Sequence, residues 1–251
     1  MSTDWLKYGK EAKETVAAEK VKAAARRGGR RFYLKPDSKG LITFIDGTIT
    51  EDGIFDTPMY YEHDIPRRDG QKGNDQFVCV ASEKGDVACP ICQENKNPGF
   101  VGVLTVIDHS QWTDREQKVH KNERRLFVYK RDSQSMLLEL AKKRGGSLIG
   151  CTFEVVRPEG QRTAKIGTMY EYKGKTDLAK IKERFKDAAS PLDYSSPKVI
   201  PFVKPEDLRK LGYGTRDTIG GEGPVTEAAS GSDFTPGEAA TEPEFDLSQL
   251  D

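Results

Sequence analysis

The sequence has 251 residues, a mean hydropathy of −0.68 and 32% charged residues, so it can bury a core although we expect part of the chain to stay unpacked. The sequence contains no run of about 18 apolar residues, which is the length needed to span a membrane. The N-terminus has no apolar block of the kind that signal peptides carry, and four cysteines are too few for a disulfide scaffold. The composition therefore predicts a protein of a reducing cytoplasm.

The formal net charge of zero conceals an uneven distribution of charge along the chain. Residues 1–35 carry ten Lys or Arg and four Asp or Glu, and residues 36–215 carry 29 and 27. Residues 216–251 carry one Arg and nine acidic residues. Such an asymmetry indicates a body that binds a polyanion, followed by an acidic tail.

The N-terminal segment, residues 1–29, is predicted to be a basic arm that contains a helix. Residues 10–27 are rich in Ala, Lys and Glu, which favour helix, and Gly28-Gly29 would end it. Strand-like runs follow, separated by turn-forming stretches such as PDSKG and RDGQKGN. These runs are residues 30–35, 40–47, 58–65, 76–81, 100–108, 124–131, 150–157 and 164–172.

Short helices interrupt the strand-rich region at about 133–144, 177–187 and 205–211. Several short strands with few helices are typical of a small β-barrel rather than of alternating β-α units. The sequence therefore predicts a mainly β core over residues 30–214.

The end of the chain is rich in Gly, Glu, Thr, Pro and Ser and has few apolar residues. This composition predicts a flexible acidic tail over residues 215–251, disordered to about residue 243. Its last residues, EFDLSQLD, place Phe245, Leu247 and Leu250 among acids, which favours a short peptide that docks on partner proteins. A purely solubilising tail is the alternative.

One group of cysteines has the spacing of a metal site. Cys89 and Cys92 are separated by two residues, so both sulfurs can turn toward one point. Cys79 lies ten positions before this pair, and His63 lies sixteen before Cys79, which gives His-x15-Cys-x9-Cys-x2-Cys. Three thiolates and one imidazole are a usual ligand set for structural Zn²⁺. We expect one structural zinc ion in a subdomain of about residues 60–99.

The same cysteines also fit roles that involve no metal. A Cys-x-x-C pair can be a redox dithiol, but that motif usually opens a helix after a strand, whereas QENKNPG follows here. Cys79 can also be an ordinary buried thiol. For the fourth ligand we favour His63, and the alternatives are His109, His120 and Cys151, although Cys151 alternates with apolar residues and fits a core position better.

The residues His63, Cys79, Cys89 and Cys92 resemble the zinc signature of the T-even phage helix-destabilising proteins, the gene-32 family of single-stranded DNA-binding proteins. The x9 and x2 spacings match, and the gap from His to the first Cys is a few residues longer here. The resemblance implies an OB-fold core, a basic N-terminal segment and an acidic C-terminal tail, in the host cytoplasm if the chain is phage-encoded. The family self-associates on DNA through a Lys/Arg-rich motif followed by Ser-Thr, whereas this chain has ARRGGRR without Ser-Thr.

Two strand-like runs interleave aromatic and basic residues, the combination that binds single strands. In RRLFVYKR, alternation predicts Leu126 and Val128 in the core and Phe127 and Tyr129 on the outer face. In RRFYLK, Phe32 and Leu34 would be buried. The alternative is a solvated strand face whose aromatics lie under a loop. The candidate DNA contacts are Arg30, Arg31, Tyr33, Lys35, Tyr60, Tyr61, Trp112, Arg125, Phe127, Tyr129, Lys130, Arg131, Arg162 and Lys165.

The interpretation that joins these features is a non-enzymatic single-stranded DNA-binding protein that coats and protects DNA in phage replication, recombination and repair. The acidic tail would compete with DNA for the basic groove and recruit partner proteins. Gly174-Lys175-Thr176 lacks the earlier glycine of a phosphate-binding loop, since Met169 stands there. The alternatives are a zinc-ribbon adaptor of replication or transcription machinery, in which protein contacts dominate, and a chaperone-like or virion-associated structural protein.

Overall fold

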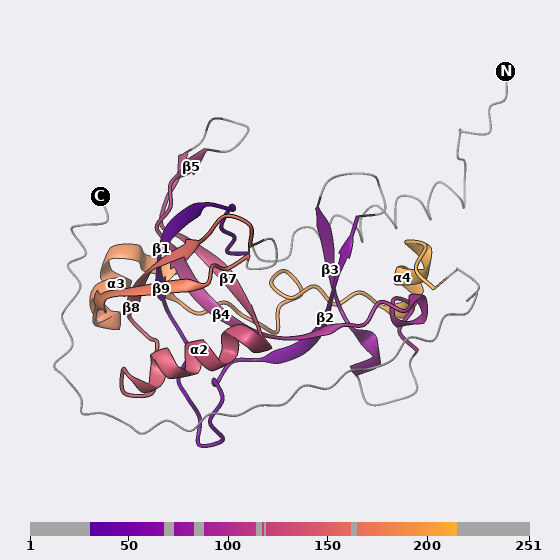
Figure 1. Cartoon of the computed structure of the whole chain (residues 1–251), viewed down its shortest axis with the longest axis horizontal. Coiled ribbons are helices and arrows are strands. Elements are labelled where there is room, and N and C mark those ends of the chain that lie inside the picture. The colour runs from indigo at the N-terminus through magenta and orange to yellow at the C-terminus, as the bar shows by residue number, and fades with distance from the viewer. Residues whose placement is uncertain are drawn as a thin grey trace.

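The structure is a computed structural model of the chain, and it describes residues 31–67, 73–82, 88–113, 117, 119–161 and 165–214 (Figure 1). The predicted helix at 10–27, the acidic tail, and the candidate residues Arg30, Arg162, Phe245, Leu247 and Leu250 lie outside these ranges.

The described part of the chain is mainly β. Its strands are β1 (Ser38–Phe44), β2 (Met59–Pro66), β3 (Asn74–Val78), β4 (Gly99–Asp108), β5 (Trp112–Thr113), β6 (Val119–His120), β7 (Glu123–Lys130), β8 (Cys151–Arg157) and β9 (Met169–Lys175). Its helices are α2 (Arg131–Lys142), α3 (Leu178–Phe185) and α4 (Pro205–Lys210), with 3-10 turns η1 (Val80–Ser82), η2 (Cys92–Glu94) and η3 (Lys186–Ala189). The helices predicted at 133–144, 177–187 and 205–211 are therefore confirmed, each within two residues at either end.

Seven strands form one antiparallel sheet with the order β3-β2-β4-β1-β8-β9, and β7 pairs with the other edge of β4. β5 and β6 form a separate small hairpin. Strand β4 joins the two halves of the sheet, because Gly99–Gly102 pair with β2 and Val106–Asp108 pair with β1. Its other edge pairs with β7 from Val101 to Asp108.

The larger half of the molecule is built on what we call the main core. It includes Ile42 and Phe44 of β1, Leu104 of β4, Phe127 of β7 and Phe153 of β8, all fully buried. Helix α2 covers this core through Leu137 and Ala141 (Figure 1). Strand β4 is buried on both faces from Val101 to Ile107, which explains why this part of its sequence is a nearly continuous apolar run.

The chain segment at 31–35 extends the sheet without being a regular strand. The N–H of Phe32 donates to the Leu126 carbonyl at 2.9 Å, and the N–H of Leu34 donates to the Lys165 carbonyl at 2.9 Å. Phe32 and Leu34 are buried, as the alternation predicts, and Tyr33 between them is exposed. The segment thus links β7 to the connection between β8 and β9. The mainly β architecture is confirmed, and the OB-fold barrel stays a prediction.

The smaller half contains the β2–β3 hairpin, the Cys-rich turn and α4, and it lies beside the larger half (Figure 1). Its buried residues form what we call the second core: Ile65, Phe77, Cys79, Val80, Cys89, Ile91, Val203, Leu208 and Tyr213. Helix α4 begins at Pro205, a favoured residue in a first turn, and lies more than 100 residues after Cys92 in the sequence. Within the described residues, the structure contains no helix that is both long enough and apolar enough to cross a membrane.

Candidate metal centre and binding surface

The four residues of the predicted metal site come from three neighbouring elements of the smaller half. His63 lies in β2, Cys79 directly follows β3, and Cys89 and Cys92 flank the start of η2. The antiparallel pairing of His63 with Phe77 brings the chain back beside β2, and the N–H of Cys79 donates to the Tyr61 carbonyl at 2.8 Å. The hairpin therefore places the first two candidate ligands close together.

The Cys-Pro-Ile-Cys segment forms a tight turn that points both sulfurs the same way. The N–H of Gln93 donates to the Cys89 carbonyl at 3.1 Å, and the N–H of Asn95 donates to the Cys92 carbonyl at 3.0 Å. Asn95 ends the turn in the left-handed conformation, which asparagine tolerates better than most residues. A 3-10 turn, and not the long helix of a thioredoxin-type motif, follows the pair.

The four ligand atoms form a compact cluster, all within 4.8 Å of one another. The Cys79 and Cys92 sulfurs are 3.6 Å apart, and His63 Nε2 lies 3.4 Å from the Cys89 sulfur and 3.6 Å from the Cys92 sulfur. In a tetrahedral zinc site with Zn–S near 2.3 Å and Zn–N near 2.0 Å, the corresponding edges are about 3.8 Å and about 3.6 Å. The cluster therefore has the size of a tetrahedral metal site.

Burial and mutual contact shift the acidities of the thiols in different directions. Burial raises the pKa of Cys79 and raises the pKa of Cys92 to about 12, where the Cys79 thiol and the Cys89 charge add to the effect. At Cys89 burial also favours the thiol, but hydrogen bonds from His63 and from the N–H groups of Cys92 and Ile91 outweigh it and lower the pKa to about 6. One thiolate is thus stabilised beside two neutral thiols, and a cation would stabilise all three as thiolates.

His63 is fully buried, and its Nε2 faces the sulfurs. Its Nδ1 has no hydrogen-bond partner among the described residues. All four cysteines of the chain are free of disulfides. The donor set, its size and its burial show that His63, Cys79, Cys89 and Cys92 could hold a metal ion. The identity of that metal stays a prediction.

The alternative fourth ligands lie elsewhere. Cys151 is buried in the main core. His109 is hydrogen-bonded to Thr43 and Asn122, and His120 stacks on Trp112 with ring centroids 4.2 Å apart. The preference for His63 as the fourth member of the cluster is therefore confirmed by the geometry.

The last described segment of the chain packs against the cluster. Tyr213 contacts Phe77 edge to face with ring centroids 5.5 Å apart, and Leu208 of α4 is fully buried in the second core. The N–H of Gly214 donates to the Glu94 carboxylate at 2.9 Å, directly behind the Cys-rich turn. Residues 203–214 therefore complete the core that holds the candidate ligands.

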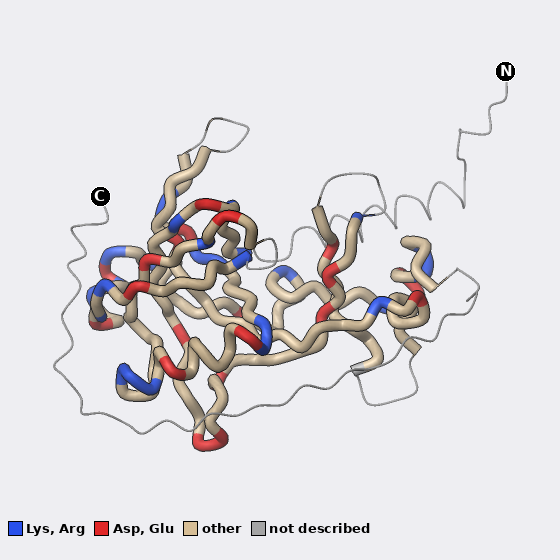
Figure 2. The backbone as a smooth tube through the Cα atoms, viewed as in Figure 1, with Lys and Arg blue, Asp and Glu red and all other residues tan. Residues whose placement is uncertain are grey.

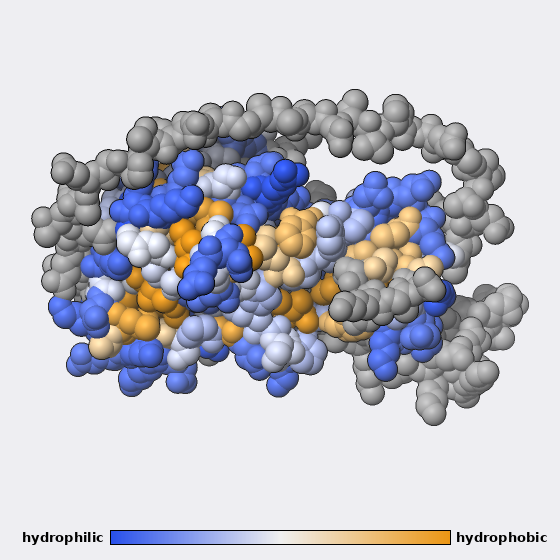
Figure 3. Space-filling view, turned by 90° about the horizontal axis from the view of Figure 1, so that it is seen from below, coloured by the Kyte–Doolittle hydropathy of each residue, from blue (hydrophilic) through white to orange (hydrophobic). Residues whose placement is uncertain are grey.

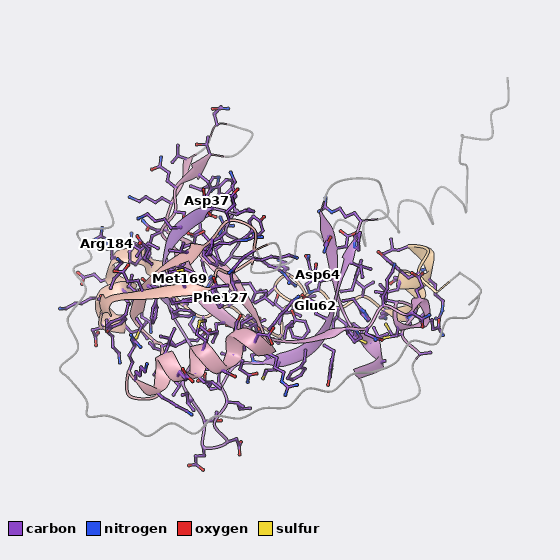
Figure 4. All side chains as sticks on the ribbon, in the orientation of Figure 1. Asp37, Glu62, Asp64, Phe127, Met169 and Arg184 are labelled. Carbon is purple, nitrogen blue, oxygen red and sulfur yellow. The ribbon has the colours of Figure 1, made fainter. Side chains whose placement is uncertain are left out.

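The predicted outward orientation of Phe127 and Tyr129 is wrong, because both are fully buried in the main core. Figure 4 shows Phe127 inside the strand-rich half. The opposite face of β7 is covered too, since Leu126 and Val128 pack against residues around Val199. Neither aromatic ring can therefore stack on a base.

Several predicted cationic contacts have acidic partners within the protein. The guanidinium of Arg31 pairs with Glu62, to which the Tyr60 hydroxyl also donates, and Lys165 Nζ lies 2.6 Å from Asp64. Both acids lie on β2 between the two halves (Figure 4). These pairs hold the halves together, which leaves little of their charge for DNA. The acidic partners come from a distant strand, so the local sequence pattern does not reveal them.

The hairpin of β5 and β6 carries Trp112, whose ring is stacked on His120. The Arg125 guanidinium lies 5.4 Å from the centre of the Trp112 ring, and Arg125 is itself buried and paired with Glu123 at 2.7 Å. The side chains of Trp112 and Arg125 therefore contact each other, and the prediction of Arg125 as a DNA contact is wrong, because this side chain is buried and paired within the protein.

Other predicted contacts are on the surface. The side chains of Tyr33 and Tyr61 are 54% and 44% exposed, and Lys35, Lys130 and Arg131 are exposed as well. The Arg157 guanidinium lies 5.5 Å from the centre of the Tyr33 ring.

An exposed aromatic that the sequence did not single out, Phe100, is 41% exposed and lies beside Tyr61. It stands at the start of the apolar run FVGVLTVID, where alternation gives no indication of which side chains are exposed.

No protein-family model, curated protein or solved structure matches the chain. The resemblance to the phage helix-destabilising proteins thus stays a prediction from the cysteine spacing.

Proposed function

We propose that this protein binds single-stranded DNA through base stacking on exposed aromatic rings and phosphate contacts with nearby cations. The observation that carries the proposal is the exposure of Tyr33 and Tyr61 on a framework fixed by two buried cores. Stacking on protein aromatics requires unpaired bases, because both faces of a base are covered in a duplex. Such a surface favours the single strand and thereby removes hairpins.

The metal of the cluster is proposed to be one structural zinc ion. Three sulfur ligands and one imidazole suit Zn²⁺, and four protein ligands leave no position for a substrate. Zinc would lend its binding free energy to the folding of the smaller half. The residues assigned to it are His63, Cys79, Cys89 and Cys92, within a subdomain of about residues 60–99 inserted in an OB-fold-like barrel.

The charge distribution supports the same proposal. The basic arm at residues 1–29 and the exposed cations of the core would neutralise phosphates, while nine acidic residues in 216–251 would compete for the same groups. Long single strands would displace the tail and leave Phe245, Leu247 and Leu250 free for replication or recombination proteins. The protein would thus coat and protect single strands without enzymatic activity.

A titration of labelled oligo-dT and of a matching duplex at several salt concentrations tests the proposal. We expect tight binding to oligo-dT, quenching of Trp and Tyr fluorescence, and much weaker binding to the duplex. Equally weak binding to both, lost as salt rises, would overturn it and favour the zinc-ribbon adaptor, in which the exposed aromatics contact protein.

A further inference from the structure

On one face of β2, a pair of exposed aromatic rings separates the two buried cores. Met59 packs on the main core, and His63 and Ile65 belong to the metal cluster and the second core. Tyr61, which shares their face by strand alternation, is 44% exposed. This face of β2 is therefore open to solvent at Tyr61, between the two cores.

Tyr61 is in register with Phe100 of β4, and their ring centroids are 4.9 Å apart at an interplanar angle of 51°. We call these two residues the aromatic pair. Two neighbouring exposed rings keep a large apolar area in water, which folding alone does not favour. Figure 3 shows apolar groups reaching the surface between hydrophilic areas on the lower face.

The backbone under the aromatic pair is well fixed. Tyr61 lies two residues before the candidate ligand His63, and its carbonyl accepts a hydrogen bond from the N–H of Cys79. Phe100 lies in β4, the long strand that joins both halves. A rigid surface loses little conformational entropy when a ligand stacks on it.

One cation lies next to the aromatic pair along the sheet. Lys130 pairs with Val101 in the β4–β7 ladder, so strand alternation places its side chain on the face opposite to Phe100. Lys130 is extended, so the next side chain, Arg131 at the start of α2, returns to the face of Phe100. Both side chains are exposed, and neither has an ion-pair partner among the described residues. Figure 2 shows basic residues at this end of α2, with Asp132 as an acid in the first turn.

From this arrangement we infer that the aromatic pair is a base-stacking site, with Arg131 contacting a phosphate of the same single strand. The inference rests on the proposed function and deepens it, because it gives the strand a defined position between the two halves. A neighbouring cation distinguishes this site from an apolar docking patch for a peptide, since each nucleotide carries a phosphate next to its base.

The first experiment replaces each ring by a side chain of similar apolar character. Tyr61→Leu and Phe100→Leu should each weaken oligo-dT binding by about 5- to 150-fold, which corresponds to the usual loss of one stacked base. Tyr61→Phe should bind like the natural protein. Phe202→Leu is the matched control, because Phe202 is also 41% exposed but lies outside the site. Unchanged metal content and unfolding temperature would show that the variants are folded.

The second experiment tests the cation. Arg131→Gln should lower the slope of log K against log salt by about 0.7, whereas Lys130→Gln, on the other face of the sheet, should leave it unchanged. Lys142→Gln and Lys143→Gln, at the other end of α2, are the controls and should leave the slope unchanged.

The outcomes separate the inference from the proposed function. Loss of affinity in both Leu variants but not in the Phe202 control would support the stacking site. If the natural protein binds oligo-dT and both Leu variants bind equally well, the stacking site is wrong and the proposed function stands. If the natural protein does not prefer single strands, both are wrong. Binding of an apolar peptide that depends on the rings but not on Arg131 would also overturn the inference.

Discussion

At the scale of single residues, His109 and Asp46 make opposite contributions to the pH dependence of folding. Burial lowers the pKa of His109 to about 4, although its Nδ1 contacts Asn122 at 2.7 Å. Burial raises the pKa of Asp46 to about 6, although hydrogen bonds from Tyr194 and Thr105 act in the other direction. His109 stays neutral in the folded protein, whereas the unfolded chain takes up a proton below about pH 6.5. The effect of His109 therefore lowers the free energy of unfolding as the pH falls from 6.5 toward 4. As the pH falls, Asp46 takes up a proton in the folded protein before it does so in the unfolded chain. The effect of Asp46 therefore raises the free energy of unfolding as the pH falls below 6.

Between pH 6.5 and 4 we therefore expect the two effects to cancel in part. Each effect changes the free energy of unfolding by up to about 3 kcal/mol. In Asp46→Asn the free energy of unfolding should fall more steeply on acidification than in the natural protein. In His109→Asn it should fall less or rise. Urea unfolding at pH 6.5 and 4.5 measures this, and the same pH dependence in all three proteins would contradict the assignment.

A second residue-scale prediction concerns Gly102 of β4. A Cβ at this position would overlap the buried ring of Tyr129, its partner in the ladder. Gly102→Ala must push this ring out of the main core, and we expect a loss of about 1–3 kcal/mol in the free energy of unfolding. Gly99→Ala in the same strand is the control, since a Cβ there would meet nothing within 4 Å. Equal unfolding midpoints for the two variants would show that Tyr129 has room to move.

Residue patterns predicted the positions of buried and exposed side chains only in part. Alternation was right for Phe32, Tyr33 and Leu34, where one face of the segment lies in water. It failed for Phe127 and Tyr129, because β7 is covered on both sides. One cover comes from residues around 192–200, more than 60 positions later, and no local pattern contains that information.

At the scale of elements, most strands and helices were predicted, because turn residues and apolar runs are local properties. The metal cluster was predicted too, since ligand spacing in a hairpin and a tight turn is also local. The packing of α4 against the cysteines was not predicted, because it depends on contacts between segments that are distant in the sequence. Leu208 and Tyr213 of this region complete the second core.

This placement leads to a prediction about metal retention. Leu208→Ala removes a fully buried side chain from the second core, and such changes usually cost about 2–5 kcal/mol. Because the candidate ligands belong to the same core, we expect a metal ion bound at the cluster to transfer faster to a competing chelator. Arg209→Ala, on the exposed side of α4, should transfer its metal at the rate of the natural protein. Equal rates for Leu208→Ala and the natural protein would mean that α4 does not stabilise the site.

At the scale of the whole molecule, two features act together. The ion pairs Arg31–Glu62 and Lys165–Asp64 join the halves, and the aromatic pair lies where the sheet passes from one to the other. A strand bound there would contact both halves at once. Residues 36–215 carry 29 basic and 27 acidic residues, so their net charge is small beside the nine acidic residues of 216–251, and we expect that segment to compete with DNA.

Removal of residues 217–251 deletes nine acids and no basic residue, so the formal net charge changes from 0 to +9. If the tail competes with phosphates, the shortened protein should bind oligo-dT more tightly at low salt. The difference should shrink as salt rises, because the Debye length falls from about 30 Å at 0.01 M to about 10 Å at 0.1 M. A variant whose tail has the same composition in scrambled order is the control. Binding like that of the natural protein would show that charge, and not the sequence EFDLSQLD, is responsible. Equal affinities of the full and shortened proteins at every salt concentration would exclude competition and leave partner docking as the role of the tail.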